Sequence, residues 1–187
     1  MMAESNQQRL ADRELARRVR EGDLSAFHAM VDRYGAALFG TALSLVGREA
    51  EAEDLVQETF TAAFRGLAGF EGRSSLKTWL TGILLRRTAT YFRRAARGNV
   101  RFVPLESAPD GAAGVPSSTE ATDARVDVTA AIQSLCPEHR EVIVLRELES
   151  LSYAEMAQVL NIPQGTVESR LFRARRELEE RLKAYLP

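Results

Sequence analysis

Between residues 151 and 178, apolar positions recur at helical spacing in two stretches separated by a short break. Ser152 and Glu155 form an S-x-x-E capping box, in which each side chain satisfies a free amide hydrogen at a helix start. Asn161 tolerates the left-handed conformation that closes a helix, and Pro163 suits the first turn of the next one. The second stretch buries one stripe, made of Val167, Leu171, Ala174 and Leu178. The pattern predicts a helix, a tight turn and a second helix.

The other face of this second helix carries polar, basic and aromatic side chains, namely Gln164, Glu168, Ser169, Arg170, Phe172, Arg173 and Arg176. Arginine can bind the acceptors of guanine with two hydrogen bonds, and Phe172 could contact a thymine methyl group. This face therefore suits a DNA major groove. The alternative is a solvated face with Phe172 packed on a neighbour, since helix-turn-helix patterns also occur without DNA. Glu168 would repel phosphate unless it accepts a hydrogen bond from a cytosine amine.

Helical spacing also runs through the first half of the chain. Residues 12–21 form a charged, mildly amphipathic helix that ends at Gly22, and Asp23 can cap a longer helix. After Gly47, another helix has an inner face of Leu55, Val56, Phe60, Ala63, Phe64 and Leu67. Its outer face carries Asp54, Gln57, Glu58, Thr61 and Arg65. Such a face is either a wet helix surface or a polar docking surface for a protein.

A loop rich in glycine and serine spans residues 66–75 and lacks both glycine patterns of nucleotide-binding sites. The helix that follows buries Leu80, Ile83 and Leu84 and carries the only tryptophan, Trp79. Farther along this helix the dipeptide Tyr91-Phe92 directly precedes Arg93 and Arg94. Interleaved aromatic and basic groups can hold an unstacked nucleic-acid strand.

From residue 98 to about residue 123 the composition shifts to proline, glycine, serine and small residues, which predicts a flexible linker. Beyond it, Val128, Ala131, Ile132 and Leu135 open a helix, and Pro137 fits the first turn of the next, whose apolar positions run to Leu148. No strand alternation is evident. We therefore predict an all-α chain of two small helical domains joined by a flexible linker, with a helix-turn-helix in the C-terminal domain.

The 187 residues carry a net charge of only −1, which argues against indiscriminate coating of nucleic acid. The charges are nevertheless separated: residues 86–101 hold six arginines and no acid, and residues 49–58 hold five acids and no base. Two different partners, or two solvated faces of opposite sign, would explain this separation. No apolar run approaches the roughly 18 residues of a membrane span, and the polar N-terminus does not resemble a signal peptide, so we expect a cytoplasmic protein.

Catalytic and metal-binding chemistry finds little support in the sequence. One cysteine excludes an internal disulfide framework, and two isolated histidines offer no triad. Cys136 and His139 have the C-x-x-H spacing that could begin a metal site, but no second pair of ligands accompanies them. We expect no enzyme activity, no cofactor and no metal.

Taken together, these segments resemble the sigma-70 family of transcription initiation factors, in its compact extracytoplasmic function (ECF) group. The matching N-terminal motifs are A-E-D-L-V-Q-E-T-F at 52–60, F-E-G-R-S-S-L-K-T-W-L at 70–80 and the arginine run. The C-terminal match extends from Leu135 through G-T-V-E-S-R-L-F-R-A-R at 165–175. Only the linker and the extreme N-terminus fall outside the resemblance.

The resemblance implies a role for each part of the chain. Residues 1–97 would form sigma domain 2, 98–124 a linker in the RNA exit path, and 125–187 sigma domain 4, which also contacts the flap of the polymerase beta subunit. The clamp helices of the beta-prime subunit would be bound by Asp54, Gln57, Glu58 and Phe60. Minus-10 DNA would be bound, and one base captured, by Phe70, Arg73, Ser74, Ser75, Lys77, Trp79, Arg86, Arg87, Arg93 and Arg94. Minus-35 DNA would be read by Gln164, Thr166, Glu168, Ser169, Arg170, Phe172, Arg173 and Arg176.

Two features bear on how such a factor would work. Family members usually follow W-L with x-x-I-A-x-N, whereas this chain has Leu84 for the alanine and Arg86 for the asparagine. The sequence ends at Pro187, soon after the last predicted helix, so we expect none of the C-terminal sensory extensions of some relatives. Regulation is then expected from an anti-sigma factor.

Three other functions remain as alternatives. A free-standing helix-turn-helix regulator explains residues 151–176 but leaves the acidic helix and the arginine run without a role. A sigma-like mimic that titrates an anti-sigma factor is favoured only by the altered segment at Leu84 to Arg86. An enzyme has no credible site.

Overall fold

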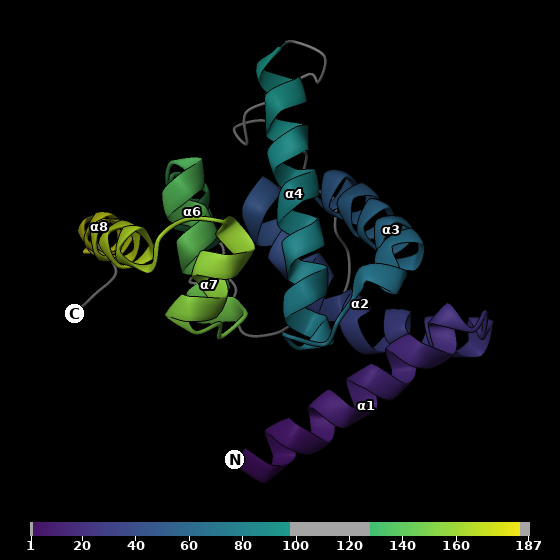
Figure 1. Ribbon diagram of the computed structural model, residues 1–187. Coiled ribbons are helices and arrows are strands. Elements are labelled where there is room, and N and C mark those ends of the chain that lie inside the picture. Colours follow the sequence, from purple (N-terminus) through teal and green to yellow (C-terminus); the bar gives the residue numbers. More distant parts are fainter. Residues whose placement is uncertain (1, 98–127, 184–187) are drawn as a thin grey trace, which may run out of the picture.

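The computed structural model describes residues 2–97 and 128–183, and every regular element within these ranges is helical (Figure 1). The N-terminal part contains α1 (Met2–Arg20), α2 (Leu24–Val46), α3 (Glu49–Gly66), the 3-10 turn η1 (Leu67–Gly69) and α4 (Leu76–Ala96). The C-terminal part contains a helical stretch at 128–133, α6 (Pro137–Ile143), the π-helical segment η3 (Val144–Leu148), α7 (Tyr153–Leu160) and α8 (Gln164–Leu182). The prediction of two helical domains is confirmed, while the predicted linker lies outside the described residues.

Local capping chemistry sets most of the helix ends. Asp23 accepts hydrogen bonds from the amides of residues 25 and 26 at the start of α2, and Gly47 closes that helix at a φ of 76°. Ser75 caps α4 by accepting from the amide of residue 78 at 3.0 Å. The first helix, predicted over residues 12–21, instead begins at Met2.

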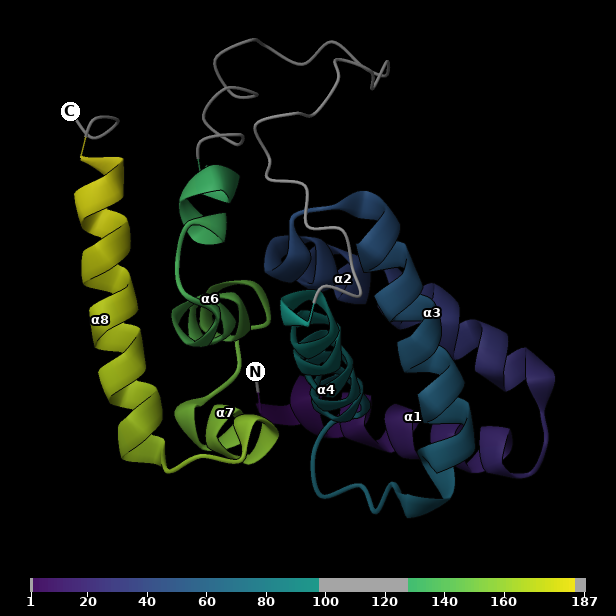
Figure 2. The same ribbon diagram turned by 90° about the horizontal axis from the view of Figure 1, so that it is seen from above.

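The N-terminal helices pack around one apolar core, in which α2, α3 and α4 each contact the other two and α1 crosses their ends (Figure 2). Its fully buried residues include Leu38, Leu45, Leu80 and Leu84. Leu84, which stands where the resembled family usually has alanine, is thus a core residue of α4. Its departure from the family pattern fills the interior and does not alter the surface.

The C-terminal part departs from its prediction just before the helix-turn-helix. The sequence predicts one helix from Pro137 through Leu148, but α6 ends at Ile143 and continues as a single π-helical segment. There the amide of Glu149 bonds the carbonyl of Val144, five residues back. The wider turn leaves Leu148 half exposed and turns Glu149 inward.

The two parts lie against each other and share a continuous core. Helix α7 packs on α4, and α6 with η3 packs on α2, while α8 lies on the far side of the C-terminal part (Figures 1 and 2). Polar groups add to this contact, because Arg140 donates to the carbonyl oxygen of Leu45 at 2.7 Å. Among the described residues, no helix is both long enough and apolar enough to traverse a lipid bilayer.

Candidate functional site

The predicted helix-turn-helix is formed by α7 and α8. Both halves of the capping box are present: Ser152 accepts from the amide of Glu155 at 3.3 Å, and the Glu155 carboxylate accepts from the amide of Ser152 at 2.9 Å. Asn161 closes α7 in the left-handed conformation, at a φ of 54°. Pro163 was predicted within the first turn of the second helix, but it is the N-cap, and α8 begins one residue later, at Gln164.

The expected reading face of α8 points away from the rest of the molecule. Val167, Leu171 and Ala174 form the buried stripe that holds α8 in place. Gln164, Glu168, Ser169, Phe172, Arg173 and Arg176 are exposed, and Thr166 and Arg170 are partly buried. Phe172 is 63% exposed, so it does not pack on a neighbour as the alternative interpretation required. The Gln164 amide donates to Glu168 at 3.0 Å, which orients both side chains at the start of this face.

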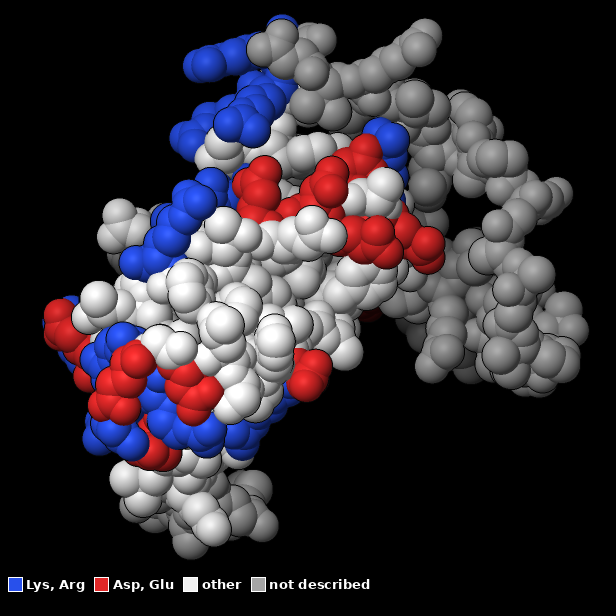
Figure 3. Space-filling view, turned by 90° about the vertical axis from the view of Figure 1, so that its right-hand side faces the viewer, with Lys and Arg blue, Asp and Glu red and all other residues white. Residues whose placement is uncertain are grey.

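An acidic and amide row follows the outer face of α3. Asp54, Gln57 and Glu58 are exposed and line an open hollow of about 540 Å³ with Thr61, Arg65 and Arg87. The guanidinium of Arg87 on α4 lies 3.7 Å from the Glu58 carboxylate. Figure 3 shows a cluster of acidic side chains on this side of the molecule, beside a row of basic side chains and an uncharged patch. The row therefore presents carboxylate and amide acceptors to a partner.

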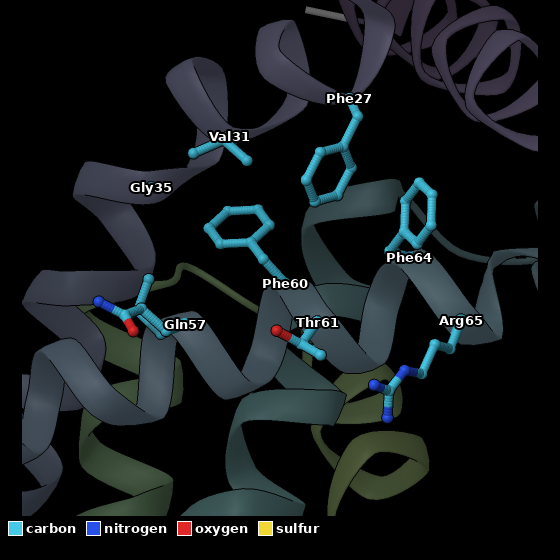
Figure 4. A pocket seen from close by; sticks show the side chains of 9 residues that line it. Phe27, Val31, Gly35, Gln57, Phe60, Thr61, Phe64 and Arg65 are labelled. Atoms are coloured by element: carbon cyan, nitrogen blue, oxygen red, sulfur yellow. The ribbon is translucent and has the colours of Figure 1, made fainter. Parts of the chain in front are cut away.

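Next to this row, an apolar hollow of about 730 Å³ opens between α2 and α3 (Figure 4). Phe60 is only 6% exposed and lies at its floor, whereas Phe64 is 46% exposed at its edge. The rings of Phe27 and Phe64 meet edge to face with centroids 5.1 Å apart. Gln57 and Thr61 line both hollows, so the polar row and the apolar hollow form one continuous surface.

Several side chains of the loop from residue 70 to residue 75 make contacts that fix its shape, although the loop is rich in glycine and serine. Phe70 is buried, with its ring centroid 5.3 Å from that of Trp79. The Ser75 hydroxyl is engaged in capping α4, and Ser74 donates to the carbonyl of Ser75 at 3.3 Å. Arg73 is exposed and pairs with Glu71 at 3.0 Å. Of the loop positions implied by the resemblance, Arg73 is thus the one that projects into solvent.

Helix α4 carries the remaining residues assigned to minus-10 DNA. Arg87, Arg93 and Arg94 line the outer side of α4, where Arg93 donates to the Thr90 hydroxyl at 3.0 Å, and Arg86 is exposed. The sixth arginine of the run, Arg101, lies outside the described residues. Lys77 is already in an ion pair, since its ammonium group lies 2.9 Å from the carboxylate of Glu149 in the C-terminal part.

Some residues of these surfaces were not predicted from the sequence. Phe64 was assigned to the inner face of α3, yet it forms the edge of the apolar hollow together with Phe27. Helical spacing placed Phe64 on the correct side of α3 but did not reveal where α2 stops covering it.

Cys136 and His139, the C-x-x-H pair, lie near no further group that would complete a metal site among the described residues. Cys136 is exposed at the N-cap of α6, and His139 Nδ1 lies 3.0 Å from the Glu177 carboxylate. This contact and the hydrogen bond from Arg181 hold the pKa of Glu177 below its usual value. Over residues 2–97 and 128–183, no three histidine, cysteine or acidic residues gather as a metal-binding group.

Comparison with known proteins covers both parts of the chain. Residues 30–98 match the family described as Sigma-70 region 2, and residues 125–178 match Sigma-70, region 4. The ECF RNA polymerase sigma-E factors of Salmonella typhimurium and Escherichia coli are each 35% identical over 94% of this chain and 96% of theirs. The RNA polymerase sigma-H factor of Pseudomonas aeruginosa is also 35% identical, over 94% of this chain and 95% of its own.

Two solved structures share the fold. CnrH in complex with the cytosolic domain of CnrY is 34% identical, with a TM-score of 0.69 over 93% of this chain and 98% of that one. The sigma factor RpoE of Bartonella quintana, bound to the anti-sigma factor NepR, is 30% identical, with a TM-score of 0.67 over 84% of this chain and 96% of that one.

Proposed function

The chain belongs to the ECF group of the sigma-70 family, and from that premise we propose how it divides transcription initiation among its surfaces. As a sigma factor it directs RNA polymerase to promoters, and the polymerase performs the chemistry. We assign polymerase docking and minus-10 DNA to residues 1–97, the linker to 98–124, and minus-35 DNA to 125–187. We place its action in the cytoplasm, where the polymerase works, and we expect control by an anti-sigma factor such as the one bound to the Bartonella relative.

The continuous surface of α3 carries the assignment of polymerase docking. Its acceptors Asp54, Gln57 and Glu58 adjoin the phenylalanine-lined hollow, so it offers a charged rim beside an apolar centre. Protein interfaces commonly have this arrangement, and an amphipathic helix can bury its apolar side chains in such a groove. A clamp helix that presents basic residues beside apolar ones would fit both halves.

Promoter DNA is assigned to two separate faces. The exposed arginines of α4 would follow the phosphate backbone of the opened minus-10 strand, and the 70–75 loop would receive a base. The exposed face of α8 would enter the major groove of the minus-35 element. Capture of an unstacked base offsets an unstacking cost of a few kcal/mol, and joining two weak DNA readers on one polymerase raises their effective affinity.

The double substitution Asp54→Ala with Gln57→Ala tests the docking surface. Both side chains are exposed, so the fold should persist, while affinity for core polymerase should fall at least about tenfold, or roughly 1.4 kcal/mol. Fluorescence anisotropy of the labelled protein against core polymerase measures this directly. Run-off transcription on a promoter library, with and without the protein, then shows whether initiation falls in parallel.

Glu53→Ala is the matched control, because Glu53 is an exposed acid on the same helix that lines neither hollow. It should leave polymerase affinity close to that of the unaltered protein. If the double variant binds polymerase as well as this control, the outer face of α3 is simply a solvated surface and docking lies elsewhere.

A further inference from the structure

No single residue of helix α1 has been given a role above, yet one of its side chains holds the start of α4. Asp12 is only 2% exposed, and its Oδ1 accepts from the Tyr34 hydroxyl at 2.5 Å. Its Oδ2 accepts from the amide of Leu76, the first residue of α4, at 3.2 Å. That amide has no partner within its own helix, so Asp12 supplies one from a distant element. Burial and the bond to Asp12 raise the pKa of Tyr34, which keeps the hydroxyl protonated as a donor.

The next residue of α1 holds the apex of the loop that precedes α4. Arg13 donates from Nη2 to the carbonyl oxygen of Gly72 at 3.1 Å. Gly72 has a φ of 68°, which favours glycine, and a Cβ placed on it would lie 2.8 Å from Arg13 Nε. The loop is therefore fixed at its apex and at its exit by two consecutive residues of α1.

We propose that Asp12 and Arg13 are positioning residues for promoter opening. They hold the 70–75 loop in the shape in which it receives a base from the separated strand, and neither needs to touch the DNA. The proposal rests on the function proposed above for this loop. A receiving site must be held to within a fraction of an ångström to discriminate among bases, so loosening it should reduce selectivity more than overall binding.

Arg13→Ala is the main test, with Arg20→Ala as its control. Both arginines are exposed on α1 and line the hollow beside the loop, but Arg20 makes no bond to the loop. Transcription is measured on promoters that carry each of the four bases at each minus-10 position. Arg13→Ala should reduce the ratio of transcription from the best base to transcription from the other bases on the order of tenfold. Arg20→Ala should leave that ratio unchanged, because any loss of transcription should be equal for all promoters. Arg13→Lys keeps a charged donor and should recover part of the preference.

The single tryptophan provides a readout that does not depend on polymerase. Trp79 lies against Phe70 of the loop, so acrylamide should quench its fluorescence more strongly in Arg13→Ala than in Arg20→Ala. Asp12→Asn should act in the same direction, because Tyr34 and Leu76 donate to two different oxygens of Asp12, and an asparagine has an oxygen at only one of those positions. Arg13→Ala remains the decisive variant, since Asp12 is buried and its loss also weakens the fold.

The outcomes separate this proposal from the function on which it rests. If the unaltered protein shows no base preference in the minus-10 element, the loop does not receive a base and the positioning role fails with it. If the unaltered protein discriminates and Arg13→Ala discriminates equally well, the loop assignment stands and the positioning role is overturned.

Discussion

Arg173 is the residue from which we expect the clearest effect on minus-35 recognition. It is exposed on α8 next to Phe172, and the buried stripe on the other side of the helix fixes its direction. Arg173→Ala should weaken binding by about 1 to 3 kcal/mol when the preferred upstream bases are present. Competition among promoters with single-base changes in the minus-35 element measures the loss and the position at which it occurs.

Arg175→Ala supplies the comparison for that experiment. Arg175 lies on the same helix but pairs with Glu147 at 2.9 Å, and this exposed pair is worth at most about 1 kcal/mol. Its removal should change promoter choice little. A loss in Arg173→Ala that is equal for every upstream sequence would instead identify Arg173 as a phosphate contact.

At single residues, helical spacing predicted the side of a helix better than the depth of burial. Phe60 and Phe64 lie four positions apart on the inner side of α3, and both were expected to be buried. Phe60 is 6% exposed and Phe64 46%, because α2 covers only part of that side. Spacing within one helix carries no information about where its neighbour ends.

At the level of single elements, the helix-turn-helix depends on the capping box at Ser152. Ser152→Ala removes an acceptor for the amide of Glu155, and we expect the free energy of unfolding to fall by about 1 kcal/mol. Thermal unfolding followed by circular dichroism measures the change. Ser44→Ala removes a serine that bonds within α2, to the carbonyl of Gly40, and should be nearly neutral. Equal melting temperatures for the two variants would mean that the cap does not limit stability.

The helix ends were largely predictable because their causes are local. Asp23, Gly47, Ser152 and Asn161 each act on groups within a few residues, so the sequence alone reveals them. The π-helical segment Val144–Leu148 was not predictable, since nothing in its composition distinguishes it from an ordinary helix end. Its consequence, a buried Glu149, depends on Thr41 and Lys77 from distant helices.

At the scale of the molecule, the separation of charge was visible in the sequence, whereas the packing of α7 on α4 was not. Acids on α3 and arginines on α4 lie side by side, yet they were expected to meet different partners (Figure 3). The sequence pattern did not single out Gly82, which lies where α7 approaches α4: a Cβ on it would be 3.9 Å from both methyl groups of Val159. Near-neutral net charge and an occupied Lys77 both point to weak DNA binding by the free protein. Tight, specific promoter binding without polymerase would contradict that expectation.

The change in distance between the domains can be measured directly, because Cys136 is the only cysteine and is exposed in the C-terminal part. Glu53→Cys adds a second exposed site on α3. Pulsed electron paramagnetic resonance then measures the distance between spin labels attached to the two cysteines. We expect a short distance in the free protein and a distance several tens of ångströms longer in the polymerase–promoter complex. The minus-10 and minus-35 elements are about 25 base pairs apart, which is roughly 85 Å at about 3.4 Å per base pair. The 30 residues from 98 to 127 can cover at most about 100 Å, so the chain is long enough.

Glu179→Cys paired with Cys136 gives the control, since both labels then lie in the C-terminal part and their separation should stay constant. A long distance from residue 53 to Cys136 in the free protein would mean that α7 does not pack on α4 there. An unchanged short distance in the promoter complex would instead mean that the two DNA-reading faces do not occupy both elements together. Only lengthening of the first distance, with the second unchanged, fits a factor that opens between its two domains to span a promoter.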